Sequence, residues 1–175
     1  MHIGRLRPDH RGRLGELLVG TGAFNAEEVA VALALFDASQ DALAVAAPDA
    51  NVTAKDYEFV GAFEDERLVG YACFGATPAT DGTYDLYWLA VDPAVQGRGI
   101  GRALVRDVEQ QLVARGGRLL VVETSSRAAY AATRRFYARS GYAEAARVRD
   151  FYAPADDRIL LTTRLTTRDG GAATR

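Results

Sequence analysis

An apolar run that ends at a proline and leads into alternating glycines is the feature that most constrains this chain. Residues 84–91 are aromatic or aliphatic apart from Asp85, which is the composition of a buried strand. Asp92-Pro93 ends that strand, because proline lacks the N–H group that a ladder needs. The segment Gln96-Gly-Arg-Gly-Ile-Gly-Arg102 follows directly. We therefore expect a strand, a turn and a glycine-rich helix start.

The glycine-rich segment has the properties of a phosphate-binding loop. Gly97, Gly99 and Gly101 allow a ligand to approach the backbone closely. The first amides of the following helix lack internal partners and lie at the positive end of its dipole, and Arg98 and Arg102 add charge. A dinucleotide-binding fingerprint fails, because Arg102 stands where its last glycine should be. A P-loop fails, because no Gly-Lys-Ser/Thr sequence is present.

The rest of the chain predicts alternating helices and strands of the α/β (α+β) class. The helix after the glycines has one apolar face, formed by Ile100, Leu104, Val108 and Leu112. Before it we expect a strand at 2–7, helices at 9–20 and 26–39, and strands at 57–63 and 67–76. After it we expect a strand at 118–123, a capping-rich loop at 124–126, a helix at 128–140 and an antiparallel pair at 142–152 and 157–165.

The bulk properties fit one domain over residues 1–165, followed by a flexible tail at 166–175. The net charge of −2 gives no reason to expect a nucleic-acid partner. Cys73 is the only cysteine, and His2 and His10 form no ligand cluster with it, so we expect no metal. No signal peptide or membrane-spanning run is visible, which predicts a cytoplasmic protein without a membrane partner. A homodimer is compatible with the sequence.

A polar stripe marks the helix at 128–140. Tyr130, Thr133 and Tyr137 are spaced i, i+3 and i+7, which predicts that they share one helix face. Buried hydroxyl groups need hydrogen-bond partners, and a bound cofactor would supply them. Phe136 lies close to that face, where core packing explains it.

The segment 84–102 resembles motif A of the GNAT superfamily of N-acetyltransferases. That motif has the pattern Gln/Arg-x-x-Gly-x-Gly/Ala, which Gln96, Gly99 and Gly101 match. The resemblance implies that this loop holds the pyrophosphate of acetyl-CoA, and that the strand end before it binds the pantetheine arm and acetyl group through its backbone. The implied cofactor-binding residues are Leu89, Ala90, Val91, Gln96, Gly97, Arg98, Gly99, Ile100, Gly101 and Arg102.

The helix stripe resembles motif B of the same superfamily. The common form is Asn-x-x-Ala-x-x-Leu/Phe-Tyr followed by Gly-Phe/Tyr, and here Tyr130 replaces the asparagine and Thr133 the alanine. The resemblance implies that Tyr130, Thr133 and Phe136 contact CoA, and that Tyr137 protonates the departing thiolate. It also implies a mixed, splayed β-sheet flanked by helices, with CoA between the two strands that part.

Two carboxylates are candidates for the general base. Asp85 lies six residues before Val91, where protein-acetylating members of the superfamily carry a glutamate, and strand alternation predicts that Asp85, Tyr87, Leu89 and Val91 share a face. Glu123 ends the next strand, where members acting on ribosomal-protein N-termini place a base. We assign Glu123 as the base and Asp85 to acceptor binding. The alternative for Glu123 is a structural pair with an arginine such as Arg127.

The resemblance implies transfer of an acetyl group from acetyl-CoA to an amine of a small molecule or peptide, without a metal. The alternative function is a non-catalytic acyl-CoA-binding regulatory domain, which would need the loop but neither acid nor base. The two helices after the first strand help form the acceptor pocket in the superfamily. Thr21, Phe24 and Asn25 are therefore candidates for contacts with the acceptor.

Overall fold

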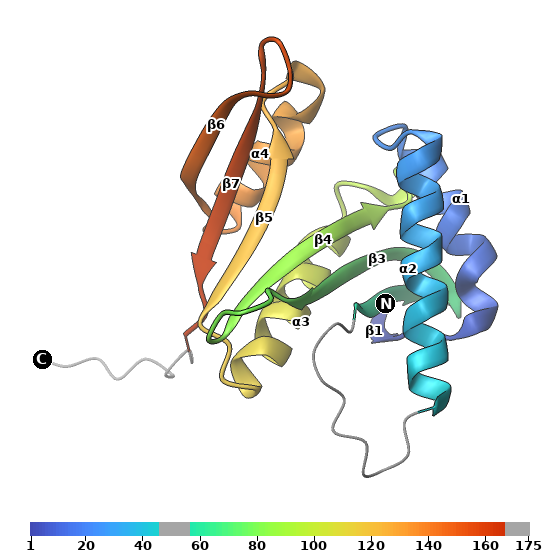
Figure 1. Cartoon of the computed structure of the whole chain (residues 1–175). Coiled ribbons are helices and arrows are strands. Elements are labelled where there is room, and N and C mark those ends of the chain that lie inside the picture. The colour runs from blue at the N-terminus through green and yellow to red at the C-terminus, as the bar shows by residue number, and fades with distance from the viewer. Residues whose placement is uncertain (46–56, 167–175) are drawn as a thin grey trace, which may run out of the picture.

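The computed structural model describes residues 1–45 and 57–166, in which seven strands form one sheet flanked by helices (Figure 1). The strands are β1 (His2–Arg5), β2 (Glu58–Glu64), β3 (Arg67–Ala76), β4 (Thr83–Val91), β5 (Leu119–Ser125), β6 (Ala143–Ala153) and β7 (Asp156–Arg164). The helices are α1 (Arg11–Thr21), α2 (Ala26–Val45), α3 (Ile100–Ala114) and α4 (Ala131–Arg139). Short 3₁₀ turns are η1 (Pro8–His10), η2 (Pro93–Val95) and η3 (Ala128–Tyr130).

The sheet is mixed, and one short parallel pairing joins its two halves. Its strand order is β1-β2-β3-β4-β5-β7-β6, and only β4 and β5 run parallel. Their pairing extends from Thr83 opposite Leu119 to Leu86 opposite Val122 and then stops. Beyond that point the two strands diverge, as Figure 1 shows. The predicted mixed and splayed sheet is confirmed.

Two apolar clusters lie on opposite faces of the sheet. The first packs under α3 and α4, and α3 contributes Ile100, Leu104, Val105, Val108 and Leu112 to it. The second packs under α1 and α2 through Leu14, Leu17, Leu18 and Phe36. The helical periodicity predicted for α3 is therefore confirmed. The two clusters hold α1 and α2 on one face of the sheet, and α3 and α4 on the other.

Several predicted boundaries change for local reasons. Residues 124–126 were expected to form a loop, but Thr124 and Ser125 are buried in β5, because pairing with β7 continues to Ser125 opposite Arg158. Asn25 caps the start of α2, since its side chain and that of Glu28 each accept a hydrogen bond from the other's backbone N–H, at 2.9 and 2.8 Å. Apart from Thr166, the predicted tail at 166–175 lies outside the described residues.

A β-bulge at Tyr87 changes which side chains of β4 share a face. Cys73 pairs with Trp88 and Phe74 pairs with Leu86, so Tyr87 is an extra residue without a partner on β3. Leu86 belongs to the cluster under α3, whereas Trp88 packs against the cluster under α1 and α2. The two-residue alternation is therefore broken at this point.

The predicted common face of Asp85, Tyr87, Leu89 and Val91 is consequently wrong. Leu89 and Val91 pack against the cluster under α3, on the same side as Leu86. Asp85 is the neighbour of Leu86 before the bulge, and so it faces α1 and α2 instead. The bulge places the carboxylate and the end of β4 on different sides of the sheet.

Candidate active site

The glycine-rich loop connects the end of β4 to the first turn of α3. Gly97 and Gly99 have φ angles of +78° and +85°, in the left-handed region that favours glycine. The Gln96 side chain donates to the Val91 carbonyl at 3.1 Å, which folds the loop back onto the strand end. The first helical bond runs from Ala103 N–H to the Gly99 carbonyl, and the amides before it have no helical partner. The predicted strand, turn and glycine-rich helix start are confirmed.

The side chains of this loop differ in what they could offer to a phosphate. Ile100 is buried in the core, so only its backbone can face a ligand. Arg98 forms an ion pair with Glu64 at 2.8 Å, while Arg102 is exposed. A Cβ atom at Gly101 would lie at an ordinary 3.5 Å from Phe136, so packing alone does not require glycine there. The loop can therefore present backbone amides, with Arg102 beside them.

Asp92 links the turn before the glycine-rich loop to α1. One of its carboxylate oxygens accepts a hydrogen bond from Ala94 N–H at 3.0 Å, and the other pairs with Arg13. Arg13 also donates to the Leu68 carbonyl at 3.1 Å, and Arg67 lies 3.4 Å from the carboxylate. The Ala94 amide and then the Arg13 guanidinium hold the pKa of Asp92 below its ordinary value. The role of Arg13 could not be predicted from the sequence, because Arg13 lies 79 residues from Asp92 along the chain.

The lowered pKa of Asp92 predicts an acid-dependent contribution to stability. Because its folded-state pKa lies below the ordinary 3.8, the unfolded chain binds more protons in that range. The contribution should be fully present above pH 3.8 and lost as the pH falls through the folded-state pKa. Urea unfolding from pH 6 to pH 3 should therefore show a shallower acid loss of stability for Asp92→Asn than for the wild type. Asp81→Asn, at an almost fully exposed carboxylate in the loop before β4, is the control and should keep the wild-type slope.

Beyond Leu86 and Val122, the edges of β4 and β5 that face each other have no neighbouring strand. Leu89, Ala90 and Val91 pair with β3 on one edge, and β5 has already separated from their other edge. On the opposite wall, the Thr124 hydroxyl is buried and has no hydrogen-bond partner among the described residues. The backbone groups of this strand edge and the Thr124 hydroxyl would gain hydrogen-bond partners from a polar ligand bound between β4 and β5.

Tyr137 of α4 lies on the α3 side of the sheet. Its ring is buried, with centroids 5.0 Å from Phe136 and 5.2 Å from Tyr142. No group of the described residues accepts a hydrogen bond from its hydroxyl. Burial raises the pKa of Tyr137, so the phenol keeps its proton at neutral pH. Thr133 and Phe136 are half-buried on the same helix, and Phe136 lies beside Gly101.

Tyr130 does not share the α4 face, which corrects the predicted stripe. It lies in η3, just before the first residue of α4, because the chain enters the helix through a 3₁₀ turn. Its hydroxyl donates to the Ala23 carbonyl at 3.2 Å. Tyr130 therefore links the start of α4 to the turn between α1 and α2, next to the acceptor candidates Phe24 and Asn25. Thr21, the third candidate, uses its hydroxyl within α1 to bond the Leu18 carbonyl at 2.8 Å.

The two candidate bases lie on the same face of the sheet, toward α1 and α2. Asp85 pairs with Val121, and Glu123 follows two residues later on the same side of β5. Asp85 accepts a hydrogen bond from the Thr77 hydroxyl at 2.6 Å. Glu123 forms an ion pair with Arg158 and accepts a hydrogen bond from Tyr152 at 2.5 Å. The arginine partner of Glu123 is thus Arg158 and not Arg127, because β7 lies directly beside β5.

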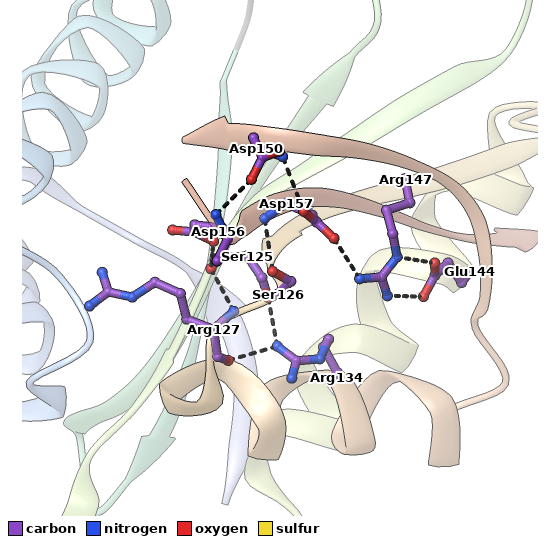
Figure 2. A network of polar contacts seen from close by, with 10 residues as sticks. Ser125, Ser126, Arg127, Arg134, Glu144, Arg147, Asp150, Asp156 and Asp157 are labelled. Carbon is purple, nitrogen blue, oxygen red and sulfur yellow. Dashed lines mark hydrogen bonds and ion pairs between the residues drawn. The ribbon is translucent and has the colours of Figure 1, made fainter. Parts of the chain in front are cut away.

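A polar network holds the β6–β7 hairpin against the end of β5 (Figure 2). Ser125 donates to the buried carboxylate of Asp156, and the Ser126 hydroxyl accepts from Asp157 N–H at 2.8 Å. Arg134 of α4 donates to the Ser125 carbonyl at 2.6 Å. These contacts fix the hairpin that brings Tyr152 and Arg158 to Glu123. The adjacent serines and the Asp156-Asp157 pair were the only sequence signals of this network.

The two strands of the hairpin are also held to each other by polar contacts. Arg147 forms ion pairs with Glu144 and Asp157, each at 2.9 Å, as Figure 2 also shows. Asp157 and Asp150 in addition accept backbone hydrogen bonds across the hairpin. Phe151 and Tyr152 remain exposed, and Arg158 lies over the Phe151 ring at 4.9 Å. The exposed aromatic side chains therefore belong to the wall of the Glu123 site.

Comparisons with known proteins place the chain in a family. A sequence model of the acetyltransferase (GNAT) family matches residues 32–142. A GNAT-family protein structure from Desulfovibrio desulfuricans is 41% identical, with a TM-score of 0.83 over 94% of this chain and 99% of that chain. The structure of yncA from Salmonella typhimurium with its cofactor acetyl-CoA is 21% identical, with a TM-score of 0.70 over 99% of both chains.

One curated relative is similar over a shorter stretch. The N-alpha-acetyltransferase RimI of Mycobacterium tuberculosis is 46% identical over 77 residues, which cover 42% of this chain and 46% of that protein. The alignment thus spans less than half of the relative's length. The family match covers more than half of this chain, and the chain belongs to the acetyltransferase (GNAT) family, as its two motifs predicted.

None of the helices among residues 1–45 and 57–166 is long and apolar enough to cross a membrane. Within the same residues, no group of three or more histidine, cysteine, aspartate or glutamate side chains is arranged to hold a metal ion.

Proposed function

We propose that the protein transfers the acetyl group of acetyl-CoA to an amine. The observation that carries this proposal is the divergence of β4 from β5 directly before a glycine-rich helix start. The divergence leaves the inner strand edges unpaired, with a buried phenol on one face of the sheet and two carboxylates on the other. Family membership and the acetyl-CoA complex of the structural neighbour yncA support acetyl-CoA as the donor.

The donor would lie along the strand end and the loop. We assign the pyrophosphate to the backbone amides of residues 97–102, where unpaired N–H groups and the positive end of the α3 dipole coincide. The pantetheine arm is assigned to the uncovered edge of Leu89, Ala90 and Val91. Thr133 and Phe136 would contact the donor from α4, and Tyr130 would border it from η3.

The chemistry requires one base and one acid. The amine is protonated at neutral pH, so it must lose a proton before its nitrogen attacks the thioester carbonyl carbon. A carbon–nitrogen bond forms, the attached nitrogen loses its second proton to solvent, the carbon–sulfur bond breaks, and the thiolate leaves. We assign the first proton to Glu123, which Arg158 and Tyr152 hold in one orientation. We assign the protonation of the thiolate to Tyr137, and the resulting phenolate takes up a proton from solvent.

The acceptor would bind on the α1 and α2 side of the sheet. Asp85 supplies negative charge there and the half-exposed Tyr152 supplies an aromatic wall, a combination that attracts a cationic amine, whereas the charge of Glu123 is shared with Arg158. The N-alpha-acetyltransferase relative favours the α-amine of a peptide over a small-molecule amine. The alternative is a domain that binds acyl-CoA without turnover. Such a domain would need neither the buried phenol of Tyr137 nor the oriented carboxylate of Glu123.

The first prediction tests the function itself. Incubation with acetyl-CoA and a panel of peptides and small amines should release free thiol only when a suitable amine is present. Gly99→Glu should abolish acetyl-CoA binding in calorimetry, because a carboxylate would repel the pyrophosphate and the left-handed φ would be strained. Gly101→Ala, two residues away, should keep binding, since the site has room for a methyl group. Tight binding without turnover on any amine would instead favour the non-catalytic alternative.

The second prediction concerns Tyr137. Tyr137→Phe keeps the packing of the ring and removes the acidic proton. We expect kcat to fall roughly a hundredfold, as the loss of a general acid often costs, while acetyl-CoA affinity changes little. Stopped-flow detection of thiol release measures the rate, and Tyr142→Phe is the control for a second buried phenol in the same cluster. An unchanged kcat in Tyr137→Phe would assign the residue to packing alone.

The third prediction distinguishes the roles of Glu123 and Asp85. Glu123→Gln should remove the rise of kcat/KM with pH that reports ionisation of the base, whereas Asp85→Asn should raise KM for the acceptor and keep the profile. The pH dependence of kcat/KM for both variants decides between them. A wild-type profile for Glu123→Gln, together with a lost profile for Asp85→Asn, would reverse the two roles.

A further inference from the structure

A group of aromatic side chains lies beside Asp85 on the face of the sheet toward α1 and α2. The ring centroids of Tyr57 and Tyr87 are 4.9 Å apart, and those of Tyr87 and Trp88 are 6.1 Å apart. Tyr57 and Trp88 both pack against the apolar cluster under α1 and α2, which places the Tyr87 ring on the same face. Tyr87 is the extra residue of the β-bulge, and 38% of its surface is exposed. The group therefore presents an aromatic surface that a ligand can reach.

Asp85 adds negative charge to this aromatic surface. Its side chain is half-buried and accepts a hydrogen bond from the Thr77 hydroxyl at 2.6 Å. Among the described residues Asp85 takes part in no ion pair, whereas Glu123 on the same face is paired with Arg158. Burial, and then the charge of Asp85, raise the pKa of Tyr87 to about 12, so its phenol is neutral at physiological pH. The surface thus combines neutral aromatic rings with a carboxylate that no described cation balances.

Asp85 and Glu123 are separated by a distance that one acceptor molecule can span. Asp85 pairs with Val121, and Glu123 lies two residues further along β5 on the same face. With about 3.3 Å per residue along a strand and about 4.8 Å between strands, the Cα atoms of the two acidic residues lie about 8 Å apart. An acceptor whose amine lies at Glu123 can therefore place a second group at Asp85.

The chemistry of this surface favours a cation as that second group. Ammonium and guanidinium groups are attracted to the faces of aromatic rings, and more strongly where water is partly excluded. Such a cation would also pair with the Asp85 carboxylate. An uncharged side chain would contact the rings, but it would cover Asp85 without replacing the water that solvates the carboxylate. An anionic group would be repelled.

We propose that Asp85, Tyr57 and Tyr87 form a subsite for a second cationic group of the acceptor. The inference rests on the proposed function, which places the amine that is acetylated at Glu123. A lysine side chain beside the α-amine of a peptide would supply the second cation, and so would the far amine of a short diamine. The subsite would therefore select acceptors that carry two positive charges over acceptors that carry one.

Two matched pairs of acceptors test the proposal on the full chain with saturating acetyl-CoA. The first pair is a peptide that begins Ala-Lys and the same peptide with norleucine, which lacks the amine, in place of lysine. The second pair is the diamine cadaverine and its monoamine analogue pentylamine. The dicationic member of at least one pair should have a kcat/KM at least about tenfold higher, mainly through a lower KM, as a partly desolvated cation–π contact allows. Discrimination within the peptide pair or within the diamine pair identifies the source of the second cation.

Variants assign this discrimination to the subsite. Tyr87→Leu and Asp85→Asn should each lose most of the ratio by raising KM for the dicationic acceptor, with KM for its monocationic partner nearly unchanged. Asp81→Asn makes the same charge change at an exposed carboxylate in the loop before β4, and it should keep the wild-type ratio. Unchanged thermal unfolding of Tyr87→Leu shows that a lost ratio does not come from a folding defect.

The outcomes separate this inference from the proposed function. If the wild type acetylates amines but neither dicationic acceptor exceeds its partner, the inference is overturned and acetyl transfer stands. An equal loss for both members of a pair in Tyr87→Leu would also overturn it, because Tyr87 would then serve packing alone. Absence of turnover with every amine would overturn the proposed function as well.

Discussion

The short parallel pairing of β4 with β5 is the constraint on which the rest of the site depends. It joins two antiparallel halves of the sheet through only four residue pairs and stops at Leu86 and Val122. The two strands can diverge because each remains paired along its other edge. β4 stays paired with β3, and β5 stays paired with β7. The unpaired inner edges then need partners, since backbone groups cannot remain unsatisfied in a buried place. An elongated polar ligand is one way to supply them.

The bulge at Tyr87 determines what lies on each side of that gap. One extra residue in β4 sends Leu89 and Val91 toward α3, while Asp85 stays on the face of α1 and α2. The proposed donor contacts and the proposed acceptor contacts therefore occupy different faces of one strand. Tyr137 lies on the first face, and Glu123 lies on the second. This division matches a reaction whose two substrates meet within a sheet.

The candidate site is held by contacts between segments far apart in sequence. Arg13 of α1 clamps Asp92, which in turn caps the turn into the glycine-rich loop. Ser125 and Asp156 lock the β6–β7 hairpin beside β5, and Tyr152 and Arg158 then orient Glu123. Such supports fix a reacting group within a narrow range of geometry, which is what general acid–base chemistry requires.

The sequence by itself determined the order of elements, the glycine-rich helix start and the family, because these depend on local patterns such as the repeat from Ile100 to Leu112. It also placed Tyr137, Glu123 and Asp85 among the residues to consider. Only the tertiary structure decided which face Asp85 occupies, that Tyr130 bonds Ala23, and that Arg158 is the partner of Glu123. A bulge depends on register with a neighbouring strand, and a partner dozens of residues away depends on strand order. Neither is encoded in the spacing of residues along one segment.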